Sequence, residues 1–201
     1  MINLKDSENN PLLSIEEIKA QIIEIMLAAV DNPSNAVEWA LAEMIYQPDI
    51  LYQACKELDE VVGKDRLVDE SDLSKLNYVK ACVKEAIRLY PTRPLNLPHM
   101  STKDIIVGGY FIPKDSEVKL VDHELCMMSF SAGRRVCPGV VLGSTMTTIL
   151  LARLIQGFRW IIAPNGLHKV NLAESEDLLM AKPLIAQAVP RLEPRVYHKL
   201  M

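Results

Sequence analysis

The residues best suited to chemistry lie at positions 130–139, which read FSAGRRVCPG and contain Cys137. A thiolate binds metals far better than a thiol, so the surroundings of this cysteine must stabilise a negative charge. Pro138 fits the first position of a helix, which would make Cys137 the N-cap residue, with backbone N–H groups and the positive end of the helix dipole facing its sulfur. Gly133 and Gly139 permit tight turns and close approach of the backbone to a flat ligand. The loop therefore predicts a metal ligand at Cys137, and an inert buried thiol is the alternative for a cysteine without such a context.

Two further sets of polar residues stand upstream. Glu85 and Arg88 lie three residues apart and share one face of a predicted helix, a spacing most often seen in solvated surface ion pairs. Asp31 and Asn32 directly precede Pro33, which removes a backbone donor and crowds the preceding turn of a helix. A bend that frees backbone carbonyls in mid-helix often marks a ligand site.

The elements that would position these residues are mostly helices. Ser14 and Glu17 form a capping box, and apolar residues continue at helical spacing on both sides of Pro33, which predicts one bent helix at about residues 14–47. Two separate helices are the alternative. The other expected elements are helices at 48–62 (closed by Gly63), 77–90 and about 138–156, two short strands within 105–112, and strand-like pieces at 158–162 and 184–189. The predicted fold class is mainly α with small β-sheets.

Composition narrows the possible functions. The 201 residues are enough for one domain with a sizeable core, and a net charge of −4 gives no sign of a nucleic-acid surface. The four cysteines show no Cys-x-x-Cys spacing, which favours reduced thiols on a cytosol-facing protein. The first ten residues are polar and lack the apolar core of a signal peptide. The uncharged run between Arg135 and Arg153 contains several hydroxyl side chains, so a buried helix is expected there rather than a membrane span.

The spacing Phe-x-x-Gly-x-Arg-x-Cys-x-Gly resembles the haem-binding loop of the haem-thiolate monooxygenases, the cytochrome P-450 superfamily. The resemblance implies that Cys137 is the axial ligand of the haem iron, that Phe130 packs beside the sulfur, and that Arg135 pairs with a haem propionate. It also implies dioxygen as co-substrate and electrons from NADPH, delivered by a reductase partner.

The upstream residues fit the same family. Glu85 and Arg88 resemble its Glu-x-x-Arg pair, whose role is structural, on the helix behind the haem. Residues 28–39 resemble its oxygen-activating helix, in which Asp31 is retained and Asn32 replaces the usual alcohol. An amide can donate a hydrogen bond to bound oxygen but relays protons less readily than a hydroxyl. Asp31 and Asn32 are the expected catalytic residues, beside the structural Pro33.

Three strings narrow the resemblance to the plant amino-acid N-monooxygenases of specialised metabolism, which convert an amino acid into an aldoxime. They are DNPSNA at 31–36, NLPH at 96–99 and AKPL at 181–184. In the second, His99 falls where the family places a side chain on a haem propionate. A surface histidine in a proline-rich loop is the alternative.

The resemblance covers nearly every residue of the chain but only the C-terminal part of a usual family member, so we expect one partial domain at 1–201. The membrane anchor, which holds full-length members on the cytosolic face of the endoplasmic reticulum, and the N-terminal helices have no counterpart. A family segment before the cysteine loop also has none, which predicts an internal deletion near 115–118 and a Glu85–Arg88 pair without its usual third partner. The alternative to an active enzyme is a non-catalytic truncated remnant or an incomplete gene model.

Overall fold

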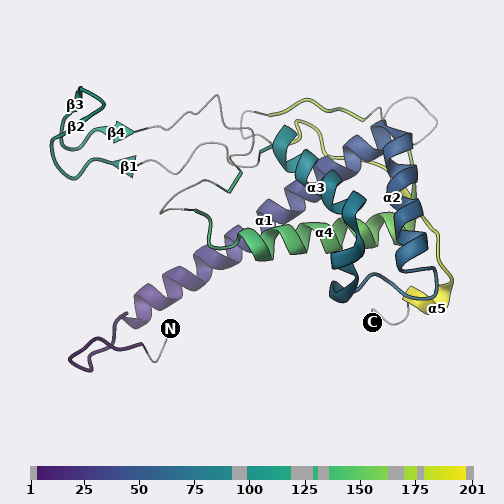
Figure 1. The fold of residues 1–201 in the computed structure, drawn as a ribbon, viewed down its shortest axis with the longest axis horizontal. Helices are drawn as coiled ribbons and strands as arrows, with labels where there is room; N and C mark the ends of the chain where they lie inside the picture. The colour runs from purple at the N-terminus through teal and green to yellow at the C-terminus, as the bar shows by residue number, and fades with distance from the viewer. Residues whose placement is uncertain are drawn as a thin grey trace.

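The computed structural model describes residues 4–91, 99–118, 129–130, 136–162, 170–175 and 179–197. Within these residues the chain is mostly helical, and its β-structure consists of three two-stranded antiparallel sheets (Figure 1). The predicted fold class, mainly α with small sheets, is confirmed.

One continuous helix, α1 (Ile15–Tyr46), passes through Pro33. The capping box at its start is formed as predicted, since Glu17 N donates to Ser14 Oγ at 3.2 Å and Ser14 N donates to Glu17 Oε2 at 2.8 Å. Pro33 has no N–H to give to the carbonyl of Ala29, and beside it Asn32 Nδ2 donates to the neighbouring carbonyl of Ala28 at 3.1 Å. The expectation of a single helix is confirmed, and the alternative of two helices is wrong.

The next helices form a compact group. They are α2 (Pro48–Val61), the short 3₁₀ helix η1 (Glu70–Lys75) and α3 (Asn77–Leu89). Gly63 follows the end of α2 with a φ of 80°, the left-handed conformation that glycine adopts without strain. The Glu57 carboxylate of α2 accepts hydrogen bonds from the backbone N–H groups of Tyr78 and Val79 at 2.8 and 2.9 Å, and so caps α3 from outside.

The apolar helix α4 (Val140–Gly157) begins two residues later than the predicted Pro138. Its first i→i−4 hydrogen bond joins Gly143 N to Gly139 O at 2.7 Å, while Cys137 N donates to Phe130 O at 2.9 Å and is thereby held in the loop. Gly139 is consequently the N-cap, and the predictions of Cys137 as N-cap and Pro138 as first helical residue are wrong. The helix ends at Gly157, one residue beyond the predicted end at about 156.

Helix α4 lies at the centre of the molecule and packs against α1, α2 and α3 (Figure 1). By length and composition it is the one helix of the described residues that could cross a membrane, and 39% of it is buried within the chain. Leu151, Ala152 and Ile155 are fully buried, which is the expected pattern for a core helix.

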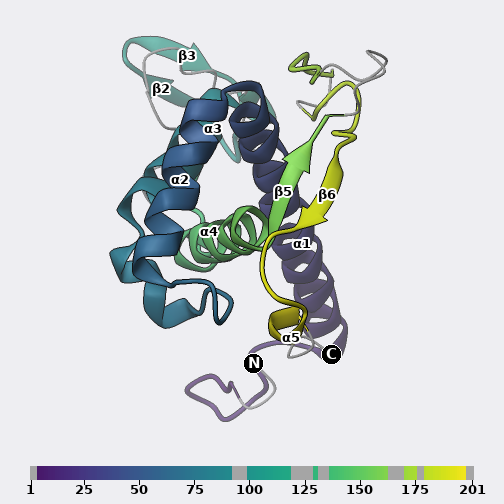
Figure 2. The same cartoon turned by 90° about the vertical axis from the view of Figure 1, so that its right-hand side faces the viewer.

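The short strands pair locally and at long range. The predicted hairpin is confirmed as β2 (Ile105–Val107) and β3 (Tyr110–Ile112), with φ of 57° and 85° at Gly108 and Gly109. Next to it, β1 (His99–Met100) pairs with β4 (Glu117–Val118). The remaining pair, β5 (Phe158–Ile161) with β6 (Gln187–Pro190), lies beside α1 and α4 in Figure 2 and is followed by the single-turn helix α5 (Pro194–Tyr197).

Candidate functional site

Cys137 stands at the point where the loop meets α4. Its thiol is free and half-buried, and its backbone N–H is bound to Phe130 O. A Cβ built on Gly139 would lie 3.7 Å from the sulfur, so the glycine leaves open the space that a side chain would fill beside it. Gly139 has no side chain with which to cap α4, so the partial positive charge of the helix start faces this region.

Phe130 fixes the other end of the loop. Its half-buried ring packs against the main core, and its Cε1 atom would lie 3.8 Å from a Cβ built on Gly143, one turn into α4. The neighbouring Ser129 donates from Oγ to the carbonyl of Ile87 on α3 at 2.9 Å. The start of the loop is therefore attached to both α3 and α4.

The Glu85–Arg88 ion pair predicted on α3 is present. Arg88 donates to both oxygens of the Glu85 carboxylate at 2.8 and 2.6 Å, and this bidentate contact holds the pKa of Glu85 below its usual value. The two side chains are 55% and 46% exposed, respectively, which makes the pair a surface one in this chain. Its structural role behind a haem stays a prediction.

The candidate residues of α1 differ in exposure. Asp31 is exposed, Asn32 is half-buried and Pro33 is buried. The carboxamide of Asn32 is engaged with its own helix through the bond to Ala28 O. Among the described residues, no hydrogen bond or ion pair joins Asp31 or Asn32 to Cys137, and their catalytic role stays a prediction.

The structure gives little information on three of the predicted cofactor-binding residues. Gly133 and Arg135 lie outside the described residues. The backbone of His99 pairs with Val118 in the β1–β4 ladder, but its side chain is outside the described part.

An aromatic contact that the sequence analysis missed joins α1 to the end of α3. The rings of Trp39 and Tyr90 stack at 3.8 Å with an interplanar angle of 4°, and the Tyr90 hydroxyl donates to Glu43 at 2.5 Å. Burial, together with the Glu43 carboxylate, raises the pKa of Tyr90. A signal was present in the sequence, because Trp39 continues the apolar spacing of α1 and Tyr90 directly precedes the proline that ends α3, but spacing alone could not pair them.

The donor chemistry fits a cofactor that needs one protein ligand. Among the described residues, no group of three or more His, Cys, Asp or Glu side chains is placed to hold a metal ion. A half-exposed thiol with free space beside its sulfur suits an iron whose other ligands come from a planar macrocycle. Two pockets of about 290 and 250 Å³ lie elsewhere in the described structure, and Cys137 lines neither.

Comparison with known proteins identifies the family. The model of the cytochrome P-450 family matches residues 1–126 and 119–187. Among the curated relatives, the phenylalanine N-monooxygenase of Arabidopsis thaliana is 54% identical over 226 aligned positions, covering 96% of this chain and 42% of that protein. The valine N-monooxygenase 1 of Manihot esculenta is 49% identical, over 98% of this chain and 42% of that protein. The tyrosine N-monooxygenase of Sorghum bicolor is 46% identical, over 98% of this chain and 41% of that protein.

These matches confirm the resemblance that the cysteine loop indicated, including the branch, since the relatives are named as amino-acid N-monooxygenases. The chain spans about two fifths of the length of the curated relatives it matches. With a family model matching most of its length and relatives at about half identity, the chain belongs to the cytochrome P-450 family.

Proposed function

We propose that this chain is part of a haem-thiolate monooxygenase that N-hydroxylates an amino acid toward an aldoxime. The observation that carries the proposal is Cys137, a free, half-exposed thiol beside the open space at Gly139, in a chain whose relatives are amino-acid N-monooxygenases. Those relatives act on phenylalanine, valine and tyrosine by name, so the substrate class is an amino acid with an apolar or aromatic side chain.

In this proposal one group of residues binds the cofactor and a second group positions or exchanges protons. Cys137 holds the iron, with Phe130 and Gly139 beside the sulfur, and Gly133 shapes the loop. Arg135 and His99 are assigned to the haem propionates. When bound, the haem supplies dioxygen activation with electrons from NADPH, delivered by a reductase. The whole protein is assigned to the cytosolic face of the endoplasmic reticulum.

Asp31 and Asn32 take the proton-handling role in this proposal. The exposed Asp31 carboxylate can exchange protons with water. Asn32 donates one amide hydrogen to Ala28 O, which leaves its second amide hydrogen and its oxygen for a ligand. Because an amide holds its protons, Asn32 is assigned to orient a bound group rather than to relay protons.

A specific observation favours a second candidate, a non-catalytic remnant of such an enzyme. The alignments with the relatives run over 226 to 231 positions although the chain has 201 residues, so at least 25 aligned positions of the relatives have no counterpart here. This excess supports an internal deletion, which we place near 115–118, directly before and within β4. A pocket that lacks such a segment would hold haem weakly.

Reduction of the haem-supplemented chain under carbon monoxide separates the two candidates. Thiolate-ligated ferrous haem gives a strongly red-shifted Soret band, and we expect this band from the chain and its loss in Cys137→Ser. Cys82→Ser is the matched control, since that half-buried cysteine lies on α3. Absence of the band from the unmodified chain would contradict the haem-thiolate proposal and support the remnant.

If the band forms, incubation with a reductase, NADPH and single amino acids tests the reaction. Aldoxime formation from an aromatic or branched-chain amino acid is the expected result. A haem-loaded chain that yields no hydroxylated product with any amino acid would identify a haem-binding remnant.

A further inference from the structure

The hydroxyl of Tyr90 is bound to a carboxylate. Tyr90 directly follows α3 and donates to Glu43 Oε1 of α1 at 2.5 Å, and both residues are half-buried. The other oxygen of that carboxylate, Oε2, accepts from Gln47 Nε2 at 2.8 Å, which fixes the orientation of the carboxylate. A phenol is thus held against a base that can take up its proton.

This arrangement is confined to one of the six tyrosines of the chain. Among the described residues, Tyr90 is the one tyrosine whose hydroxyl donates to a carboxylate. Tyr197 is also half-buried, but its hydroxyl donates to the backbone carbonyl of Gly157, which does not take up a proton at neutral pH. The remaining four are between 38% and 79% exposed: Tyr46, Tyr52, Tyr78 and Tyr110.

The charges around Tyr90 oppose the loss of a proton alone. A phenolate would stand beside the Glu43 carboxylate in a partly buried site, and burial, together with that carboxylate, raises the pKa of Tyr90. Loss of an electron has a different consequence, because the proton then moves to Glu43 and leaves a neutral phenoxyl radical beside a neutral carboxylic acid. The pair has one negative charge before this step and none after it, so burial favours the oxidised form.

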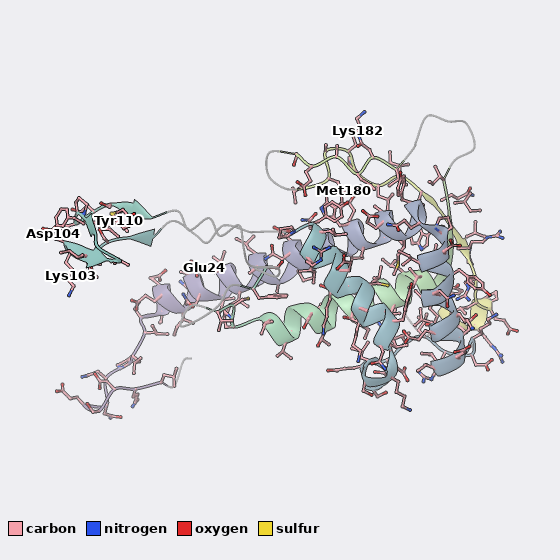
Figure 3. The ribbon with its side chains drawn as sticks, turned by 45° about the horizontal axis from the view of Figure 1, so that its top comes forward. Glu24, Lys103, Asp104, Tyr110, Met180 and Lys182 are labelled. Carbon is pink, nitrogen blue, oxygen red and sulfur yellow. The ribbon has the colours of Figure 1, made fainter. Side chains whose placement is uncertain are left out.

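Trp39 covers one face of the Tyr90 ring. The two rings stack at 3.8 Å with an interplanar angle of 4°, and Trp39 is inaccessible to solvent, in a buried cluster with Ala42 and Met180, the last labelled in Figure 3. Nε1 of Trp39 has no hydrogen-bond partner in the part of the chain that the structure describes. An oxidised indole there has no acceptor for its proton, whereas oxidised Tyr90 has one, so an oxidising equivalent shared by the stacked rings comes to rest on Tyr90.

We propose that Tyr90 and Glu43 form a one-electron redox site, which the stacked ring of Trp39 shields. In the oxidation, Tyr90 gives one electron to an outer-sphere one-electron oxidant, its O–H bond breaks, and the proton forms an O–H bond with Glu43. In the reverse step one electron from a reductant returns the proton to Tyr90. The inference does not rest on the proposed haem chemistry, because α1 and the residue after α3 form the site and its test needs no cofactor.

Photochemical oxidation of the purified chain without haem tests the proposal. The oxidant is a ruthenium(III) polypyridyl complex, generated by a laser flash with a sacrificial electron acceptor, and electron paramagnetic resonance and transient absorption record the tyrosyl radical. The background variant carries Tyr46→Phe, Tyr52→Phe, Tyr78→Phe and Tyr110→Phe, which leaves two tyrosines. We expect a tyrosyl radical in this background, which Tyr90→Phe lowers at least about tenfold and Tyr197→Phe, the matched control, leaves within about twofold.

Glu43→Gln tests the role of the proton acceptor. An amide oxygen still accepts a hydrogen bond but does not take up the proton, so radical formation at Tyr90 should slow at least about tenfold. Glu174→Gln is the matched control, since this exposed carboxylate acts on Tyr90 through its charge, and it should change the rate by less than about twofold. Circular dichroism checks that the variants keep their helix content.

Heavy water gives a second readout that needs no change at Tyr90 or Glu43. Radical formation in the background variant with Tyr197→Phe should be slower in heavy water, because the proton moves with the electron. A tyrosyl radical that persists in Tyr90→Phe and disappears in Tyr197→Phe would overturn the proposal. So would an unchanged rate in Glu43→Gln, or a background variant that forms no tyrosyl radical.

Discussion

The two halves of α1 share one backbone and similar apolar content, yet they have opposite environments. Residues 15–32 leave Ile22, Met26 and Val30 about half exposed or more, whereas Trp39, Ala42 and Met44 of the second half are essentially inaccessible. The second half packs against α3 and α4, and Met180 of the C-terminal segment, labelled in Figure 3, lies in one buried cluster with Trp39 and Ala42. Apolar residues at helical spacing predict a helix, but they become part of a core only where another segment of the chain packs against them.

The largest effect should come from truncating the buried half. Trp39→Ala removes a fully buried ring that stacks on Tyr90, and we expect it to lower the free energy of unfolding by about 3–5 kcal/mol. Met26→Ala in the exposed half should change it by less than about 0.5 kcal/mol. Urea denaturation at low protein concentration measures both. A comparable loss in Met26→Ala would break the comparison, because it would mean that the first half is covered in the single chain.

A buried amide offers the next largest effect. Gln156 on α4 is fully buried, accepts from Val68 N at 2.9 Å and donates to the carbonyls of Gly63 and Arg66 at 3.0 and 3.1 Å. Gln156→Leu leaves these three backbone groups without their partner, and we expect a loss of about 3 kcal/mol in the free energy of unfolding.

The matched control for Gln156 is Gln21→Leu, in the exposed half of α1, whose amide contacts Glu24 at 3.4 Å. We expect no measurable change from it in the same urea titration. Equal losses in the two variants would mean that burial does not decide the strength of these amide contacts.

The comparison extends to ion pairs through pH. Arg66 donates to both oxygens of Asp72, which is 10% exposed, and this lowers the pKa of Asp72 from 3.8 to about 2. A carboxyl with a lowered folded-state pKa stabilises the fold above its unfolded pKa and loses this contribution as the pH falls toward the folded value. Asp72→Asn should therefore cost about 2 kcal/mol at neutral pH and flatten the loss of stability between about pH 5 and 2.

Acid denaturation followed by circular dichroism measures that dependence. Asp65→Asn is the matched control, since Asp65 pairs with Arg195 at 3.2 Å but is 91% exposed. An unchanged acid profile in Asp72→Asn would contradict the assignment of this pair as a stabilising one.

The smallest effect on stability should come from the Glu85–Arg88 pair. Both side chains are about half exposed, so water and salt screen their attraction. We expect Glu85→Gln to leave the urea midpoint unchanged, as Glu60→Gln should for the exposed Lys56–Glu60 pair. A large loss of stability in Glu85→Gln would show instead that this pair has the structural role that the family assigns to it.

The sequence predicted the local features of this protein with good accuracy. Ser14 and Glu17 placed the start of α1, Gly63 placed the end of α2, and Gly108–Gly109 placed the β2–β3 turn. The start of α4 was the main error, because Pro138 satisfies the rules for a first helical residue while the bond from Cys137 N to Phe130 O keeps this segment in the loop. That bond joins residues whose pairing no local rule specifies.

By itself the sequence determined the helices, the turns and the family, since these depend on capping, backbone conformation and a spaced motif within short stretches of chain. The tertiary structure alone decided which half of α1 is buried, that Trp39 meets Tyr90, and that Gln156 satisfies the loop before η1. Burial is a property of contacts between residues far apart in the chain. Two stretches of similar apolar spacing can therefore end, within one helix, as a core and as a surface.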